Sequence, residues 1–283
     1  MSINRSFIKI IRKNYPRVIQ YSVLIFITAL FLYPFIWIFI SSLKDKGSIL
    51  ANPWGLPVKL FYSNYVQAWV QGNLGRGIFN SLFVTCISVG ITIVVACPAA
   101  YYFTRVTFKG KFLYYPILMS MVIPTTVLLI PLSFLGRKLN ILDSYSGLIF
   151  PYAALYIPLG IFILSNFFAS LPESLEEAAF LDGASRFQTL IHIILPISKP
   201  AVFSAMALPF IFIWNEFTLA LVLVTDPSIF TIPLAIKSFA GSYSYEYNLV
   251  FAALGIVNLF LFFILIFLQR HFVRGILSGA FKY

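Results

Sequence analysis

The sequence predicts an all-α membrane protein, a helical bundle that crosses the bilayer six times with both termini in the cytoplasm. Three observations predict this class. Of the 283 residues, 60% are hydrophobic and only 10% are charged, which is more apolar surface than a water-soluble core can bury. Apolar runs long enough to span a bilayer as a helix recur along the whole chain. Positive charges are also divided unevenly between the loops.

Each apolar run is expected to form one membrane-spanning helix, and all of them a single membrane domain over residues 1–283. Within these runs Glu216 is the one Asp, Glu, Lys or Arg residue, as expected where a charge in the membrane is costly. Many runs contain proline, so we expect bent helices supported by their neighbours. The expected spans are residues 18–42, 78–104, 112–135, 145–169, 201–224 and 249–269.

The positive charges predict the orientation of the chain. Loops on the side of the two termini hold 13 of the 20 Lys and Arg residues, and such loops are retained in the cytoplasm during insertion. The first run is too long for a cleaved signal peptide and is expected to remain as a helix. The net charge of +11 therefore reflects the orientation of the chain in a lipid bilayer. Membrane lipid is an expected partner, and nucleic acid is not.

Motifs for catalysis, phosphate binding and metal binding are missing. The single Gly-Lys pair, at 110–111, is followed by Phe112 rather than Ser or Thr, so the chain cannot form a phosphate-binding loop. His192 and His271 are the two histidines, and neither belongs to a metalloprotease pattern. The sequence predicts a protein that is not an enzyme and that binds no metal or cofactor of its own.

The 31-residue loop 170–200 is expected to hold two short helices. Ser170 and Glu173 match a capping box that would start the first helix, and Gly183 would end it in a left-handed turn. Ser185 and Gln188 match a second capping box. The second helix would carry its apolar residues in one stripe and end at 195–196; the stripe consists of Phe187, Leu190, Ile191 and Ile194.

The residues of this loop allow two interpretations. The helices could lie on the membrane surface or pack under the bundle with a solvated acidic face. Anionic lipid attracts basic rather than acidic helices, however, and this favours an acidic helix that projects from the membrane and docks on a partner. Its acidic residues are Glu173, Glu176, Glu177 and Asp182.

The same loop resembles the EAA loop of permeases from ATP-binding-cassette (ABC) importers. The residues that match are Glu177-Ala178-Ala179, Gly183 and Ile193-x-Leu195-Pro196. The surrounding segment 172–201 resembles the carbohydrate branch of this family, specifically the shorter permease subunit of maltose-type importers. Segments 214–217 and 272–282, the length and the six-span layout are similar as well, whereas residues 281–283 are bulkier than the usual ending.

The resemblance implies a type I importer permease that forms half of a translocation pathway in the cytoplasmic membrane of a prokaryote. Its implied partners are a homologous second permease, a cytoplasmic ATPase dimer that binds ATP and magnesium, and an extracytoplasmic sugar-binding protein. Helix 173–182 would enter the ATPase and transmit its closure to the spans. The implied coupling residues are Glu173, Glu176, Glu177, Ala178, Ala179, Asp182, Gly183, Ala184, Ile193, Leu195 and Pro196.

Polar residues within the last two spans are candidates for the translocation pathway. Glu216 is expected to face a polar cavity or a partner helix. Ser204, Asn215 and Thr218 would lie on one face of the same span, and Asn258 lies midway along the last one. These groups could line a sugar pathway, or they could hydrogen-bond between helices and fix the bundle, which the residues alone favour.

Three tyrosines at alternate positions, Tyr243, Tyr245 and Tyr247, precede the last span. Their composition favours an aromatic belt at the membrane interface. The resemblance implies another role, in which this loop faces the external binding protein.

Two other functions are compatible with the sequence. One is import of a different solute, such as a polyamine or a phosphate ester. The other is an ion-coupled secondary transporter that uses Glu216, although one carboxylate without a basic relay is thin support for it.

Overall fold

A computed structural model describes residues 3–106, 109–241 and 245–280. Within these ranges the chain forms helices and one isolated β-bridge, between Ala240 and Tyr245, so the expected all-α class is confirmed. The chain divides into two compact units. Unit 1 comprises Met1–Gly72 and Phe239–Asn258, and unit 2 comprises Asn73–Ser238 and Leu259–Tyr283. That the two units act together as one membrane domain stays a prediction.

Unit 1 is stabilised by hydrogen bonds around the buried side chain of Lys44. Its ammonium group donates to the carbonyl oxygens of Asn52 and Pro53, both at 3.2 Å. The Asn64 amide donates to the carbonyls of Ser42 and Lys44, so this buried loop backbone is paired as burial requires. The helices of this unit are α1 (Ile3–Ser42), α2 (Lys46–Ala51), α3 (Ser63–Gln71) and the start of α14 (Tyr247–Ala280).

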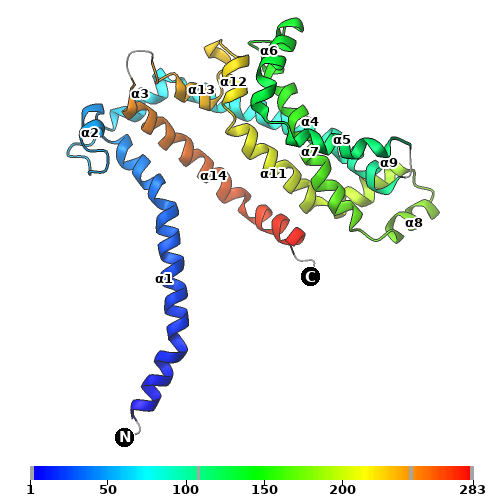
Figure 1. The fold of residues 1–283 in the computed structure, drawn as a ribbon, viewed down its shortest axis with the longest axis horizontal. Coiled ribbons are helices and arrows are strands. Elements are labelled where there is room, and N and C mark those ends of the chain that lie inside the picture. Colours follow the sequence, from blue (N-terminus) through cyan, green and yellow to red (C-terminus); the bar gives the residue numbers. More distant parts are fainter. Residues whose placement is uncertain (1–2, 107–108, 242–244, 281–283) are drawn as a thin grey trace. The chain divides into compact units, whose positions relative to one another are not determined.

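Three long helices form the centre of unit 2. Helices α4 (Leu74–Arg105), α7 (Tyr145–Ala169) and α11 (Lys199–Trp214) pack side by side (Figure 1). Small residues allow α4 and α7 to approach closely, because a Cβ atom placed on Gly160 would lie 2.9 Å from the Cβ of Ala96. Such contacts are the usual basis of helix packing in membranes, where burial from water contributes little.

Apart from the later part of α14, the other elements of unit 2 are short and connect or cover these three helices. They are η1 (Lys109–Leu113), α5 (Tyr114–Met119), η2 (Ser120–Val122), η3 (Thr125–Leu128), α6 (Leu129–Lys138), α8 (Ser174–Leu181), α9 (Arg186–Thr189), the π-helical η4 (Leu190–Ile194), α10 (Leu195–Ile197), α12 (Thr218–Leu223), η5 (Pro227–Ile229) and α13 (Ile232–Lys237).

In the described residues, three helices are long and apolar enough to cross a membrane without a break, namely Ile19–Ser42, Leu74–Arg105 and Tyr145–Ala169. They correspond to the first, second and fourth expected spans. A shorter apolar helix, Tyr247–Phe263, covers part of the sixth. The number of spans and the side of the termini stay predictions.

The expectation of one continuous helix over 112–135 is wrong. The chain forms two segments, Gly110–Val122 and Thr125–Lys138, which meet at 94°. Ile123 lies at the break with an extended backbone, at φ −72° and ψ 117°. It precedes Pro124, whose ring disfavours a helical conformation in the residue before it. The proline therefore breaks this segment rather than bending it.

The expected helix over 201–224 is also interrupted. α11 ends at Trp214 and α12 begins at Thr218. No proline lies at this break, and the side chain of Glu216, described below, supplies its hydrogen bonds instead.

A polar contact holds the loop between α6 and α7 against the segment that follows α12. The Asp143 carboxylate accepts hydrogen bonds from the backbone N–H and the hydroxyl of Thr225 and from the N–H of Asp226. Asp143 has a left-handed backbone, with φ of 52°, which Asp tolerates better than most residues. The backbone hydrogen bonds of Thr225 and Asp226 stabilise its ionised form and lower the pKa of Asp143.

Candidate functional site

Helix α8 has two different faces. At 100° per residue, Glu177, Ala178 and Leu181 share the exposed face, where the Leu181 side chain is 88% accessible. Glu176 and Ala179 lie on the opposite face and are buried. The acidic and small residues of the predicted coupling set are therefore split between a surface that a partner could reach and a surface held within the chain.

The first capping box expected in this loop does not form, so that prediction is wrong. The Ser170 hydroxyl donates to the carbonyl of Phe167 at 2.6 Å, and Ser170 is the C-cap of α7. Because Ser170 serves the end of the preceding helix, α8 begins only at Ser174, and its N-cap Glu173 makes no side-chain capping bond.

The end of α8 confirms the expected left-handed turn. Gly183 has φ of +80°, its N–H donates to the carbonyl of Phe180, and the N–H of Ala184 donates to that of Ala179. These two bonds form a Schellman motif, which satisfies the last carbonyls of the helix. The space around Gly183 is open, so backbone conformation and not crowding requires glycine here.

The second capping box is confirmed. The Ser185 hydroxyl accepts from the N–H of Gln188 at 3.3 Å, and the Gln188 side chain accepts from the N–H of Ser185 at 2.8 Å. The helix does not end at 195–196 as expected, but continues to Ile197 and then meets α11 at 81°. A π turn, in which the Leu195 N–H donates to the Leu190 carbonyl, leads into Pro196 and accommodates a residue that has no N–H.

The expected apolar stripe is divided between the core and the surface. Leu190 and Ile194 are buried in a core with residues of α4, α7 and α11, while Phe187 and Ile191 are exposed. At 100° per residue, Leu190 and Ile194 lie on one side of the stripe and Phe187 and Ile191 on the other, and only the first side meets the core. A single apolar face was therefore the wrong expectation.

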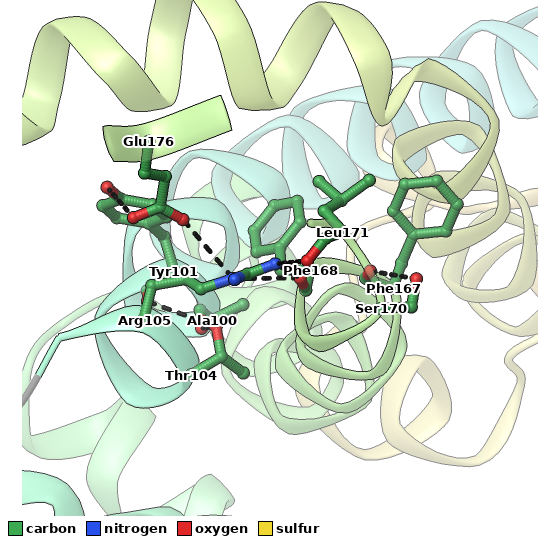
Figure 2. Close-up of polar contacts among 9 residues, drawn as sticks. All are labelled: Ala100, Tyr101, Thr104, Arg105, Phe167, Phe168, Ser170, Leu171 and Glu176. Atoms are coloured by element: carbon green, nitrogen blue, oxygen red, sulfur yellow. Dashed lines mark hydrogen bonds and ion pairs between the residues drawn. The ribbon is translucent and has the colours of Figure 1, made fainter. Parts of the chain in front are cut away.

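The buried face of α8 is attached to the rest of unit 2 through Glu176 (Figure 2). The Glu176 carboxylate accepts from the Tyr101 hydroxyl at 3.2 Å and lies 3.4 Å from Arg105 Nε. The Arg105 guanidinium also donates to the carbonyls of Phe168 and Leu171. The Arg105 and Glu176 side chains are only 7% and 9% exposed. This is a buried ion pair in which Arg105 also binds two carbonyls at the C-terminal end of α7, while the Glu176 oxygen nearest to Arg105 makes no hydrogen bond of its own to the described residues.

Sequence reasoning missed Arg105 and Tyr101. A signal was present, since Arg105 ends an apolar run and follows Tyr101 by four residues, which places both on one helix face. The pairing with Glu176 had no signature, because it depends on how the loop folds back.

A pocket of about 430 Å³ lies beside this ion pair. The Arg186 guanidinium stacks over the Phe180 ring at 5.4 Å and joins α8 to α9. Charged groups of both signs therefore line the pocket, which includes Arg105, Arg186, Glu173, Glu176, Glu177 and Phe180.

Other members of the predicted coupling set lie further along the loop. Leu195 packs partly buried against the core that holds Leu190 and Ile194. Ile193 is half-buried, whereas Asp182 and Pro196 are exposed. Leu195 thus helps to pack this segment against the core, whereas most exposed members of the coupling set lie earlier in the loop, in and around α8.

Glu216 is bound within the protein at the break between α11 and α12. Its carboxylate accepts from the Tyr152 hydroxyl at 2.6 Å and from the N–H groups of Leu219 and Ala220 at 2.7 and 3.1 Å. The carboxylate thus caps the start of α12, where free N–H groups and the helix dipole favour a negative charge. As expected, a partner helix supplies one of its contacts.

The other pathway candidates do not form one face. Ser204 and Asn215 bond to carbonyls of their own helix, those of Pro200 and Ile211. Thr218 is exposed and opens α12, so the break after Trp214 separates it from Ser204, and the expected common face is wrong. Asn258 is half-buried on α14 in unit 1.

Two of the three candidate tyrosines are described, and Tyr243 lies outside the described residues. The rings of Tyr245 and Tyr247 stack with centroids 4.7 Å apart. Between them, Glu246 forms an ion pair with Lys46 at 3.1 Å. This part of unit 1 is therefore an aromatic and charged surface next to the start of α14.

Metal binding has no support in the part of the chain that the structure describes. No group of three or more His, Cys, Asp or Glu residues there could hold an ion. The polar sites of unit 2 instead bind helix ends and other side chains.

Comparisons with known proteins agree with this architecture. The chain is 34% identical to a probable ABC transporter permease protein of Bacillus subtilis, with 88% of this chain and 83% of that protein covered. It is also 34% identical to the trehalose/maltose transport system permease protein of Thermococcus litoralis, with 89% and 91% covered. A crystal structure of a bacterial ABC transporter involved in alginate import is similar, with TM-score 0.74, 25% identity and coverage of 92% and 97%.

A family match covers most of the described core. Residues 89–278 match the family described as "Binding-protein-dependent transport system inner membrane component", and this range contains the 170–200 loop and the break at Glu216. Proteins of this kind are membrane subunits without catalytic activity of their own. The chain therefore belongs to the binding-protein-dependent transport system inner membrane component family, as a permease subunit of an ABC transporter.

Proposed function

We propose that this chain is one of two permease subunits of an ATP-driven sugar importer, and that the exposed face of α8 receives the motion of the ATPase. The observation that carries the proposal is the two-faced α8. Glu177, Ala178 and Leu181 are exposed together, and Gly183 closes the helix sharply behind them. A short helix with small and acidic residues outward suits insertion into a basic cleft.

In the proposed mechanism, ATP and magnesium bind to the partner ATPase and close its dimer. The ATPase grips the exposed face of α8 and moves the helix ends to which α8 is attached. The two permeases then open alternately to the two sides of the membrane, and sugar passes between them. The chain itself contributes half of the pathway and no chemical step.

The names of relatives support a sugar as the solute. Besides the trehalose/maltose permease, these relatives include a sulfoquinovosyl glycerol permease of Agrobacterium fabrum and a diacetylchitobiose permease of Streptomyces coelicolor. All of these substrates carry sugar rings. We therefore propose a carbohydrate rather than a polyamine or phosphate ester, and a prokaryotic cytoplasmic membrane as the location.

The pathway role of Glu216 is not part of this proposal. Its carboxylate binds Tyr152 and the start of α12, which accounts for a charge in this segment without an ion pathway. The ion-coupled alternative loses its main support, because the chain belongs to a binding-protein-dependent family.

Co-purification and a ligand screen test the proposed function. The tagged chain, purified from its native membranes, is expected to bring down a second permease, an ATPase and an extracytoplasmic binding protein. That binding protein is then screened against mono- and oligosaccharides, polyamines and phosphate esters. Sugar binding by this protein and uptake that stops when ATP is depleted are the expected results.

A different outcome would contradict the proposal clearly. Uptake that continues without ATP and collapses with an ionophore, with no ATPase bound to the chain, would indicate a secondary transporter. Binding of a polyamine or phosphate ester alone would retain the importer and reject the sugar.

A further inference from the structure

We propose that Arg105 and Tyr101 are positioning residues that lock α8 to the end of α4, so that the two helices move as one body. The inference rests on the proposed function, because it states how a motion received by α8 reaches a membrane span. The link is the buried contact among Glu176, Arg105 and Tyr101.

The geometry of the link fixes orientation as well as position. Tyr101 and Arg105 are one turn apart on α4 and reach the same carboxylate from two points. Two points of attachment resist rotation of α8 about its bond to α4, which a single contact would allow. The planar guanidinium, with its fixed donors, suits this role better than an ammonium group.

Arg105 also ties in a third element. Its guanidinium donates to the carbonyls of Phe168 and Leu171 at the C-terminal end of α7, where free carbonyls and the helix dipole attract a cation. The positive charge of the buried Arg105 is therefore stabilised by the Glu176 carboxylate on one side and by these carbonyl oxygens on the other (Figure 2). Displacing α8 alone would take the Glu176 carboxylate away from Arg105 and leave this buried cation with neutral carbonyl partners and no counter-ion, which is costly.

The backbone of α8 lies closer to α9 than to the long helices of unit 2. Gly183 follows it in a left-handed turn and Pro172 precedes it. The side chain of Glu176 supplies the hydrogen bond and the ion pair that connect α8 to α4 among the described contacts.

Spin-label distances within the assembled transporter test the link. Nitroxides are attached to cysteines placed at Ser174 on α8 and at Val94 on α4, both exposed, with Cys86 and Cys97 replaced by Ala. The distance is measured without nucleotide and after trapping with Mg-ATP and vanadate. If the two helices move together, the distance is the same in both states.

Glu176→Gln removes the charge and is expected to free α8. The distance distribution should become about twofold broader, because the charged link that fixes α8 is lost, and it should shift on trapping. Arg105→Lys keeps the charge but loses the fork and should be intermediate. Matched controls are Thr104→Val and Ser170→Ala, which remove hydrogen bonds within α4 and α7 and should leave the distance unchanged.

Two results would overturn the link. One is a nucleotide-dependent distance in the chain with an intact link, which would mean that α8 slides past α4. The other is a Glu176→Gln distribution as narrow and as constant as those of the controls. Failure of the proposed function would look different, since no ATPase would assemble with the chain, and the nucleotide-free widths of Glu176→Gln and its controls would still decide the link.

Discussion

The sites around Glu176 and Glu216 are similar in one respect and different in another. Each carboxylate accepts a hydrogen bond from a tyrosine hydroxyl on a neighbouring helix, that of Tyr101 or Tyr152. Glu216 then accepts from the N–H groups at the start of the helix that follows it. Glu176 lies next to the cation of Arg105 instead.

This difference shows what each carboxylate is suited to do. Glu216 accepts hydrogen bonds from the free N–H groups at the break between α11 and α12, and its charge is stabilised by the dipole of α12. Glu176 bonds to a tyrosine that lies 75 residues earlier in the sequence, and its charge is paired with an arginine that binds two further carbonyls. The first arrangement is that of a helix cap, whereas the second joins α8 to the ends of α4 and α7.

Loss of the cation should have the largest effect on stability. Arg105→Met leaves the buried Glu176 without a counter-ion and the carbonyls of Phe168 and Leu171 without their donor. We therefore expect the free energy of unfolding to fall by about 3–5 kcal/mol. Thermal unfolding of the detergent-solubilised protein measures this change. The double variant Arg105→Met/Glu176→Leu should recover a large part of the loss, because it removes both charges; equal losses in the single and double variants would contradict the ion pair.

The turn that ends α8 should affect transport more than stability. Gly183→Val places a β-branched residue in the left-handed region, which costs about 1–2 kcal/mol and should unwind the end of α8. We expect uptake by the assembled importer to fall about tenfold, roughly the effect of that energy on the correct turn, while the spans still insert. Gly183→Asn is the matched control, since Asn tolerates this conformation. Wild-type uptake in the valine variant would contradict the role of α8 as a lever.

Substitutions of Glu216 test whether it is only a cap. Glu216→Leu leaves the N–H groups of Leu219 and Ala220 and the Tyr152 hydroxyl without their acceptor, a loss of about 2–4 kcal/mol. Glu216→Gln keeps an acceptor oxygen and should lose about 1 kcal/mol, with a smaller effect on transport than Gly183→Val. Complete loss of uptake in the glutamine variant, with normal assembly and ATPase activity, would instead place Glu216 in the pathway.

The two tyrosines allow the most direct comparison of the sites. Tyr152→Phe removes the one side-chain donor to Glu216 in the described contacts and should cost about 2 kcal/mol, as hydrogen bonds to charged groups do. Tyr101→Phe should cost about 1 kcal/mol, because Arg105 remains beside Glu176. Thermal unfolding measures both, and the reverse order of losses would show that the arginine does not stabilise the Glu176 site.

The contact at Asp143 should give the smallest effect and serves as an exposed reference. Its folded pKa is lowered by the hydrogen bonds of Thr225 and Asp226. A lowered pKa contributes stability above the unfolded value of about 3.9, and this contribution disappears as the pH falls through the folded pKa. The wild type should therefore lose slightly more stability than Asp143→Asn between neutral pH and about pH 3. Identical pH dependence of the free energy of unfolding in both proteins would show that the hydrogen bonds at Asp143 do not stabilise the fold.

Local features of the 170–200 loop were predictable because neighbouring residues determine them. The left-handed turn at Gly183 and the capping box of Ser185 with Gln188 depend on a few adjacent side chains. Ser170 misled the prediction, because it matched a capping box but was already used to end α7. A motif that fits two neighbouring helices cannot say from sequence alone which of them it will serve.

Features that depend on distant residues could not be predicted. α11 continues through Pro209 but ends at Trp214, where the sequence has no proline or glycine. The break is stabilised by a glutamate side chain that bonds to backbone N–H groups, a competition with the helix that side-chain oxygens can win. The attachment of Glu176 to Arg105 likewise needs the ends of α4 and α7 to come together first.

The π turn at Leu190–Ile194 inserts extra length into one turn, so it sets a register between the two ends of its helix. Deleting a single residue there would restore ordinary α-helical winding and rotate everything before it by about 100° relative to α11. The exposed ring of Phe187 would then point in another direction. The direction in which the Phe187 ring points thus depends on the one extra residue of the π turn. Single-residue deletions should therefore be tolerated far less in this turn than in the neighbouring connections.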